Sequence, residues 1–335
     1  MGANTKIEWA DSTWSPWCGC TKVSPGCAHC YAETLAKRNP EVLGSWGRGA
    51  TRVRSKSEND PVKWNRRLTC DCGTVRTAAG DPRYGACPVC ESIPRNQRVF
   101  PSLCDWLDDE VPVEWLAMFL NLIAETPSVD WLLLTKRPEN WGKRLRAAHC
   151  ATTGLIRIEL AEWLAGTPPA NVWFGVSVED QTRANKRIPL LLEIPARVRW
   201  LSVEPLLGPV DLTRIDGDQS GSRSMCMVNS LTGRHTDMGR SCPDVPCIDW
   251  VVVGGESGPK ARPCNVEWIR SIVSECNAAK VPAFVKQIGA FPVGTGISEV
   301  GEPYACDLKL RHPKGGDPVE WPEALRIREF PEVNP

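Results

Sequence analysis

Three cysteines near the start of the chain have the spacing of metal ligands. Cys20, Cys27 and Cys30 form a C-x6-C-x2-C pattern in one loop that contains Pro and Gly, directly before a predicted helix. A C-x2-C pair brings two sulfurs onto one metal, and a third thiolate leaves a four-coordinate site one ligand short. A structural zinc would need that position filled, by Cys18 or His29, whereas a four-iron cluster could use it to bind a substrate. The N-terminus of the predicted helix also favours an anionic thiolate site.

Four further cysteines have the spacing of a zinc ribbon. They form two pairs with 14 residues between them, Cys70 with Cys72 and Cys87 with Cys90. Two such pairs are a strong signal for a tetrahedral zinc site, although the first pair is closer than the usual C-x2-C. The sequence therefore predicts zinc at these four thiols.

A third set of candidate zinc ligands lies later in the chain. Cys226, His235, Cys242 and Cys247 would complete a Cys3His site, although their spacing is loose. The chain has 16 cysteines in 335 residues and no apolar signal segment at its start, so its thiols should be reduced. Reduced thiols that cluster in sequence indicate metal ligands rather than disulfides.

The charge of the chain is uneven although its sum is zero. The 40 Lys and Arg residues balance 40 Asp and Glu residues. Between Arg48 and Arg98, however, 11 Lys and Arg stand against 5 Asp and Glu, a net charge of +6 that leaves −6 for the remainder. With Trp46, Trp64 and Tyr84 interleaved, this stretch could grip a nucleic acid backbone and stack a base. The alternative is a metal-stapled insertion whose charges are merely solvated.

Alternating strands and helices are predicted to position these groups. Apolar, β-branched or aromatic runs are typical of buried strands, and they fall at 131–135, 172–178, 199–203, 249–254 and 283–287. Helical patterns lie around them, at 113–125, 139–147, 155–164, 181–192 and 266–279. With two more strands at 99–103 and 7–9, this order predicts an α/β fold, a full or partial (β/α) barrel. An open doubly wound sheet is the alternative, but no glycine-rich dinucleotide fingerprint follows an early strand.

Polar, charged or glycine residues lie at the end of each of the five buried strands or directly after it. They are Thr135, Lys136, Arg137, Ser177, Glu179, Ser202, Glu204, Gly254, Gly255, Glu256 and Lys286. Any single strand must end in something polar, so one such end indicates little. Because chemistry in a (β/α) barrel collects where the strands end, five in succession predict a ring of polar groups around one mouth.

Two segments interrupt the alternation of strands and helices. Residues 40–98 and 213–248 carry cysteines but show no convincing regular element. Loops this long in a compact domain are usually functional or separately stabilised, here by metal. We therefore predict a barrel formed by 1–39 and 99–290, a basic zinc-ribbon-like insertion at 40–98, a second cysteine-containing insertion at 213–248, and a tail at 291–335 packed on the barrel.

The residues around the first three cysteines resemble a known family. The run IEWADSTWSPWCGCTKVSPGCAHCYAETLAKR is similar to phage and bacterial proteins of unknown function that carry a three-cysteine motif and are themselves similar to radical SAM enzymes. The resemblance continues through LLLTKRPENW, NVWFGVSVEDQTRANKRIPLLLEIP, RWLSVEPLLGPVDL, DWVVVGGESGPKARP, AFVKQIG and GGDPVEWPEALRIREFP. It covers nearly the whole chain apart from the two insertions, and it implies a barrel of the radical SAM type.

The resemblance implies the cofactors of such an enzyme. Cys20, Cys27 and Cys30 would hold a four-iron, four-sulfur (4Fe-4S) cluster whose open iron is chelated by S-adenosylmethionine (SAM). One-electron reduction would then cleave SAM to a 5'-deoxyadenosyl radical that abstracts hydrogen from a substrate. The usual loop is C-x3-C-x2-C, so the longer first spacing here departs from the usual signature.

The resemblance also suggests how SAM would be bound. Gly254, Gly255 and Glu256 invite comparison with the GGE motif that grips the SAM amino group. That motif normally comes soon after the cluster loop, where Asp105 could take its role, whereas this one comes late. The two glycines would instead let cofactor or substrate approach the backbone closely.

We predict roles in binding and catalysis for the other residues at the strand ends. Lys136 and Arg137 would pair with the SAM carboxylate or a substrate phosphate, and Glu179 and Glu204 would bind ribose hydroxyls or a base edge. Further expected cofactor contacts are Thr135, Ser177 and Ser202, and the candidate catalytic residues are Glu179, Glu204, Glu256 and Lys286. The alternative for each charged residue is a salt bridge that closes the barrel rim.

These observations predict a radical-SAM-like iron-sulfur enzyme that modifies or repairs a nucleic acid base or nucleotide. Such an enzyme needs an electron donor protein as a partner. The alternative is a non-catalytic, zinc-stabilised nucleic-acid-binding protein. No apolar run approaches the length of a membrane span, and we expect a cytoplasmic protein in a bacterium or a phage-infected host cell.

Overall fold

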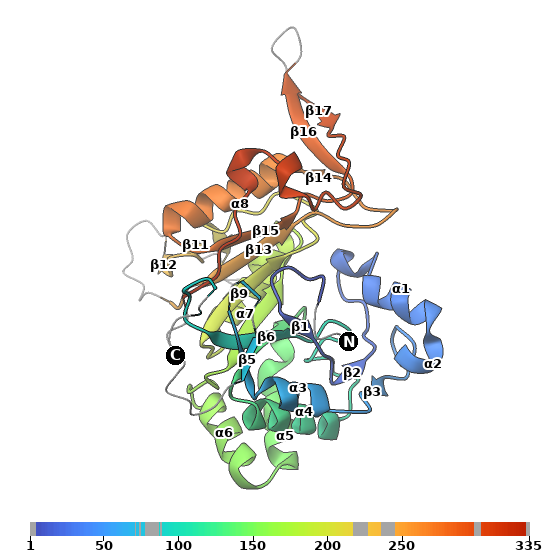
Figure 1. Ribbon diagram of the computed structural model, residues 1–335, viewed down its shortest axis with the longest axis vertical. Coiled ribbons are helices and arrows are strands. Elements are labelled where there is room, and N and C mark those ends of the chain that lie inside the picture. Colours follow the sequence, from blue (N-terminus) through green and yellow to red (C-terminus); the bar gives the residue numbers. More distant parts are fainter. Residues whose placement is uncertain are drawn as a thin grey trace. The chain divides into compact units, whose positions relative to one another are not determined.

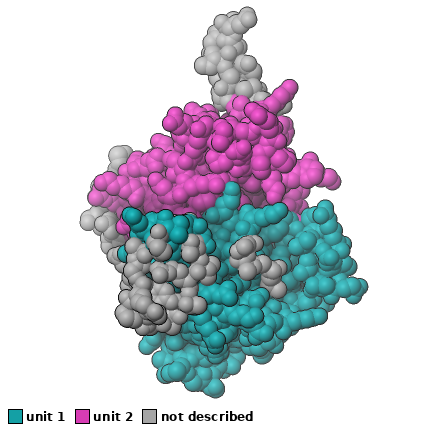
Figure 2. Space-filling model, viewed as in Figure 1, with its two compact units in different colours: residues 1–22, 31–174, 195–197 teal, residues 23–30, 175–194, 198–335 magenta. Residues whose placement is uncertain are grey.

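The structure, a computed structural model, forms two compact units. It describes residues 5–70, 72–73, 75–77, 87, 89–216, 227–235, 245–297 and 303–332. Unit 1 contains Met1–Lys22, Tyr31–Phe174 and Pro195–Arg197, and unit 2 contains Val23–Cys30, Gly175–Ile194 and Val198–Pro335 (Figure 2). The chain therefore enters unit 2 briefly within the three-cysteine motif and returns to unit 1 for the helix that follows.

A mainly parallel sheet carries the α/β architecture. Its strand order is β15-β13-β9-β8-β7-β6-β4-β5, with β1 paired to β6 (Figure 1). The long strands are β6 (Arg95–Phe100), β7 (Val129–Thr135), β8 (Val172–Ser177), β9 (Val198–Val203), β13 (Trp250–Gly254) and β15 (Ala283–Gln287). The pairs β6–β7, β9–β13 and β13–β15 run parallel. The predicted α/β fold is confirmed in its partial (β/α) barrel form.

The five long helices lie close to the ranges that the sequence predicted. They are α4 (Val113–Glu125), α5 (Trp141–Ala151), α6 (Gly154–Leu164), α7 (Gln181–Glu193) and α8 (Val266–Ala279). In α4 the buried side chains Leu116, Phe119, Leu120 and Ile123 recur at helical spacing, which places them on one face. In α8 the side chain of Asn265 accepts a hydrogen bond from the Glu267 N–H and caps the helix start.

Aromatic side chains that pack against Trp131 of β7 form the core of unit 1. Phe119 of α4 meets Trp131 of β7 edge to face, with ring centroids 5.3 Å apart, and Trp14 lies 5.9 Å from Trp131. The other elements of this unit are β1 (Ser12–Thr13), β2 (Trp17–Cys18), α1 (Tyr31–Arg38), α2 (Pro40–Leu43), β3 (Val53–Arg54), α3 (Asn59–Trp64), β4 (Arg67–Thr69), β5 (Val75–Thr77) and the 3-10 helix η2 (Pro138–Asn140). Residues 40–98 thus contain short regular elements that the sequence did not reveal.

Unit 2 has its own core around β9, β13 and β15. The rings of Trp200 and Trp250 lie 5.6 Å apart, and Phe330 from the chain's end packs 5.4 Å from Trp250. Helix α8 lies along β13 and β15 (Figure 1). The shorter elements are η1 (Pro25–Cys27), β10 (Ile215–Asp216), β11 (Met227–Asn229), β12 (Arg234–His235), β14 (Cys264–Asn265), β16 (Pro292–Ile297), β17 (Pro303–Asp307), η3 (Pro318–Glu320) and η4 (Glu323–Leu325). Among the described residues, no helix is long and apolar enough to span a bilayer.

Candidate functional site

The three-cysteine loop, residues 20–30, is divided between the two units. Cys20 belongs to unit 1, whereas Cys27 and Cys30 belong to unit 2. All three are free thiols.

In unit 2 the middle of the loop, at Ser24 and Gly26, is anchored by Glu179, which follows β8. Glu179 is fully buried, and its Oε1 accepts hydrogen bonds from the Ser24 hydroxyl and, at 3.2 Å, from the Gly26 N–H. Its Oε2 lies 2.5 Å from the guanidinium of Arg187 on α7. A Cβ on Gly26 would lie only 2.7 Å from Glu179 Oε1, so the contact needs glycine. Glu179, predicted as catalytic or ribose-binding, thus holds the loop.

A second buried carboxylate, that of Glu256 after β13, holds His29 directly and Pro25 through Arg262. His29 Nδ1 donates to Glu256 Oε2 at 3.0 Å, and the Arg262 side chain donates to both carboxylate oxygens. Arg262 also donates to the Pro25 carbonyl at 2.9 Å. Burial opposes ionisation of Glu256, but the hydrogen bonds from Arg262 and His29 prevail and lower its pKa to about 2. The carboxylate is therefore charged at neutral pH and fully engaged within the protein.

The ends of β9 and β15 carry the other predicted groups of unit 2. Lys286 Nζ lies 3.0 Å from Glu204 Oε1, and both side chains keep some exposure. A Cβ on Gly255 would lie 2.6 Å from the Ile288 carbonyl oxygen, and one on Gly254 would lie 2.9 Å from that of Gln287. The close approach that requires these glycines is therefore made by the backbone after β15. Ser177 and Ser202 are buried in β8 and β9.

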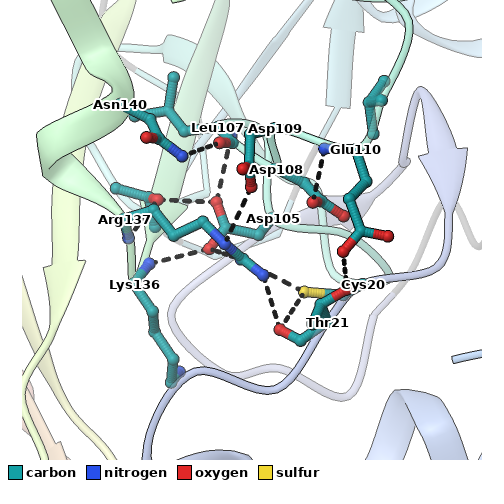
Figure 3. Close-up of polar contacts among 12 residues, drawn as sticks. Cys20, Thr21, Asp105, Leu107, Asp108, Asp109, Glu110, Lys136, Arg137 and Asn140 are labelled. Carbon is teal, nitrogen blue, oxygen red and sulfur yellow. Dashed lines mark hydrogen bonds and ion pairs between the residues drawn. The ribbon is translucent and has the colours of Figure 1, made fainter. Parts of the chain in front are cut away.

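In unit 1 Asp105 gathers the polar residues at the end of β7 (Figure 3). Its carboxylate accepts hydrogen bonds from Thr135 Oγ1 at 2.7 Å, from the Lys136 N–H at 2.9 Å and from Arg137 at 2.9 Å. The structure thus brings together four predicted cofactor-binding residues. With the Leu107 N–H at 3.1 Å, four protein donors already occupy the Asp105 carboxylate, so it supports this strand end.

Cys20 lies beside this group in unit 1. The Arg137 guanidinium donates to Cys20 Sγ at 3.5 Å and to the Thr21 carbonyl at 2.6 Å (Figure 3). Burial raises the pKa of the Cys20 thiol to about 12, the negative charge of Asp105 adds to this rise, and Arg137 opposes it. Cys20 would therefore become a thiolate only when a metal replaces its proton.

Thr21 is fixed by two further charged residues. Its hydroxyl donates to Glu110 Oε1 at 2.9 Å and accepts from Arg52 at 2.7 Å. Arg52 is itself buried and lies 2.9 Å from Asp108. Charge counting missed this role, because it treated Arg52 as one of the charges of a basic segment that either binds nucleic acid or is solvated.

Two arginines of unit 2 were also missed, and one of them has a sequence signal. Arg187 falls between Ala184 and Leu191 on the buried face of α7. An arginine at an apolar helical position indicates a buried ion pair. Arg262 follows Glu256 by six residues, in a loop without such a pattern.

The second cysteine set forms a compact group of thiols, here called the knuckle group: Cys70, Cys72, Cys87 and Cys90. The ligand atoms of Cys70, Cys87 and Cys90 all lie within 4.8 Å of one another. Cys72 Sγ lies 3.8 Å from Cys87 Sγ, and sulfurs on one tetrahedral zinc are separated by about 3.8 Å. The group could hold a metal ion, and its all-sulfur donors suit zinc.

Local backbone turns shape the knuckle group. Gly73 has a φ of +80° and donates to the Cys70 carbonyl at 2.8 Å. Glu91 has a φ of +58° and donates to the Cys87 carbonyl at 2.7 Å. The first turn joins the antiparallel strands β4 and β5, and β4 also pairs with β6. The thiols are therefore carried by a three-stranded antiparallel ribbon.

The thiols of the knuckle group differ in acidity. Burial raises the pKa of Cys70 to about 11. Hydrogen bonds from the Ser92 side chain and backbone lower the pKa of Cys90 to about 6, and the backbone N–H groups of Val89 and Cys90 lower that of Cys87. The Cys90 thiol is thus set up as a thiolate at neutral pH before any metal binds, and the pKa of Cys87 is shifted in the same direction.

Only some residues of the third cysteine set and of the predicted nucleic acid contacts lie within the described residues. Of the third cysteine set, Cys226 and Cys242 lie outside the described residues, whereas His235 ends β12 and Cys247 is half-buried. Trp64 is 4% exposed and cannot stack a base, which corrects its assignment as a nucleic acid contact. Trp46 is half-buried, and Tyr84 lies outside the described residues.

Comparison with known proteins gives one match. Residues 4–308 match the family described as "Protein of unknown function (DUF5131)". No curated protein and no solved structure matches the chain. Because the family match spans nearly the whole sequence, the chain belongs to the DUF5131 family of proteins of unknown function.

Proposed function

We propose that the protein is an iron-sulfur enzyme of the radical SAM kind, with Cys20, Cys27 and Cys30 as the cluster ligands. The observation that carries the proposal is the support given to the loop within each unit. Buried Glu179 and Glu256 hold residues 24–29 in unit 2, and Arg137 holds Cys20 and Thr21 in unit 1. Functional ligands require such fixed positions.

The donor set fits an iron-sulfur cluster. Three free thiols supply the ligands, and the Arg137 guanidinium donates a hydrogen bond to one of them, Cys20 Sγ, at 3.5 Å. Hydrogen bonds to ligand sulfurs are a recurring feature of such sites. When bound, the cluster and SAM would supply a 5'-deoxyadenosyl radical for hydrogen abstraction.

These contacts change the roles that we assign to the charged residues at the strand ends. Glu179 and Glu256 position the loop, and Arg137 and Asp105 are engaged with each other and with protein partners. Lys286 and Glu204 keep partial exposure and are the better candidates for contact with the substrate. We propose a nucleic acid base or a nucleotide as that substrate, and an electron donor protein as the reductant.

Anaerobic reconstitution with iron and sulfide tests the proposal. The wild-type chain should take up about four irons and absorb broadly near ~400 nm, and should release 5'-deoxyadenosine with SAM and a chemical reductant. Cys27→Ala should lose both properties. Cys150→Ala, which removes an exposed thiol on α5, should keep them. Iron uptake that is equal in wild type and Cys27→Ala would overturn the proposal.

The knuckle group supports a second candidate function, a zinc-stabilised nucleic-acid-binding protein. Its ribbon lies in the basic segment between Arg48 and Arg98. Against it, Arg52 and Arg98 are buried, so fewer of the positive charges face solvent. This candidate predicts strongly salt-dependent binding of nucleic acid and no formation of 5'-deoxyadenosine, and the SAM cleavage assay separates the two.

A further inference from the structure

We propose that Arg137 is a positioning residue that tunes the reduction potential at Cys20. The inference rests on the proposed function, because it assumes that Cys20 binds the cluster. It goes further by assigning one side chain to the electronic properties of the site. The sequence analysis had instead predicted that Arg137 would pair with the SAM carboxylate or a substrate phosphate.

The contacts of Arg137 leave it little freedom to bind a ligand. Its NH1 group donates to Cys20 Sγ at 3.5 Å and to Asp105 at 2.9 Å, and its NH2 group donates to the Thr21 carbonyl at 2.6 Å. The residue is only 4% exposed. Its hydrogen-bonding capacity is directed at the cysteine segment and at its own anchor (Figure 3).

Asp105 and Thr135 fix the direction of the guanidinium. Asp105 accepts from the Arg137 side chain and also from Thr135 Oγ1. Thr135 Oγ1 in turn accepts from the Arg137 N–H at 2.9 Å. Backbone and side chain of Arg137 are thus held from the end of β7, and the N–H that faces the sulfur does not depend on a flexible loop.

Electrostatics gives the expected direction of the effect. A reduced cluster carries one more negative charge than the oxidised cluster, so a nearby cation stabilises the reduced state more. Charge-assisted hydrogen bonds to ligand sulfur are stronger than neutral ones, and such bonds are among the factors that set cluster potentials. Loss of Arg137 should therefore shift the potential to more negative values.

Arg52 provides the matched comparison within the same network. It also holds Thr21, at 2.7 Å through the hydroxyl, and it is also buried. Its hydrogen bonds go to Thr21, Asp108 and the carbonyls of Gly47 and Ala50, not to sulfur. An effect of loop position alone should appear in both arginine variants, whereas an effect on the sulfur should appear only at Arg137.

The test is a redox titration of the reconstituted full-length protein, followed by EPR of the reduced cluster. We expect Arg137→Gln to shift the midpoint potential to more negative values and to change the EPR spectrum, and Arg137→Lys to give a smaller shift because the charge remains. Arg52→Gln should keep the wild-type potential, even if it lowers cluster occupancy.

Each other outcome decides against the inference. Equal potentials in wild type and Arg137→Gln, or equal shifts in Arg137→Gln and Arg52→Gln, would overturn it. Failure of both Arg137 variants to load a cluster, while Arg144→Gln loads normally, would assign Arg137 a purely structural role. Arg144 is a suitable control because it is buried on α5 and donates to the Val111 carbonyl. Absence of a cluster in the wild-type protein would instead refute the proposed function itself.

Discussion

The knuckle group and the three-cysteine loop are held by different kinds of contact. In the knuckle group, three thiols lie within 4.8 Å of one another, and nearby backbone turns supply the hydrogen bonds. In the three-cysteine loop, the anchors are charged side chains from distant parts of the chain, such as Arg137 for Cys20 and Glu179 for Ser24. A short segment can therefore encode the first group locally, whereas the second depends on the folded sheet.

The largest expected difference between the two regions is in thiol reactivity. In metal-stripped protein at pH 7, Cys90, with a pKa of about 6, should alkylate far faster than half-buried Cys20, with a pKa of about 12. The thiolate fraction favours Cys90, and the lower nucleophilicity of an acidic thiol offsets this only partly, so we expect roughly a hundredfold or more. Mass spectrometry of iodoacetamide-labelled peptides measures both rates, with exposed Cys150 as the reference. Equal alkylation rates for Cys90 and Cys20 would contradict the difference in acidity between the two regions.

Removal of a knuckle thiol should have a large effect on stability. Cys87→Ala should lose one zinc per chain and on the order of 4 kcal/mol of stability, because metal binding and folding of such ribbons are coupled. Metal analysis and thermal denaturation give the two values. Cys150→Ala, the exposed control, should change stability by less than about 0.5 kcal/mol. Unchanged zinc content in Cys87→Ala would contradict the metal assignment.

In the three-cysteine loop, Glu179→Ala tests whether the distant Glu179 side chain anchors Ser24 and Gly26. It leaves Arg187 buried without its carboxylate, and breaking a buried pair in this way costs roughly 3–5 kcal/mol. It should also reduce iron uptake, because Ser24 and Gly26 lose their acceptor. Denaturant unfolding measures the loss of stability. Glu267→Ala, which removes an exposed pair with Arg270, should cost about 0–1 kcal/mol. A similar small cost for Glu179→Ala would refute the anchoring role.

The smallest expected effect is on the pH dependence of the loop anchor at Glu256. Its pKa of about 2 lies below the ordinary value of 4.5, so the ionised carboxylate stabilises the fold above the ordinary value. This contribution is lost as the pH falls from about 4.5 toward 2. Glu256→Gln should therefore lower stability at pH 7 and flatten its fall in this acid range, measured by unfolding at several pH values. Parallel curves for the variant and wild type would show that Glu256 does not carry the effect.

The sequence predicted the main elements well because their patterns are local. The apolar runs of β7, β9, β13 and β15 and the helical spacing in α4 and α8 identify buried strands and amphipathic helices directly. The short elements within 40–98 were missed, since strands of two or three residues such as β3 and β4 carry too little periodicity to detect. The paired spacing of the knuckle cysteines, in contrast, identified a thiol group that the fold indeed brings together.

The α/β class, the identity of the candidate ligands and the polar character of the strand ends can all be predicted from the amino-acid sequence. Tertiary structure decided what those polar residues do. Glu179 and Glu256 were candidate functional residues with salt bridges as the alternative, and Asp105 was a candidate for binding SAM; each is buried with an arginine that lies 6 to 32 residues away along the chain. A buried charge must be neutralised by a partner, and sequence shows the charge but not which distant side chain reaches it. Only the fold brings Arg187, Arg262 and Arg137 to those acids, and it thereby turns predicted ligands of a substrate into supports for the three-cysteine loop.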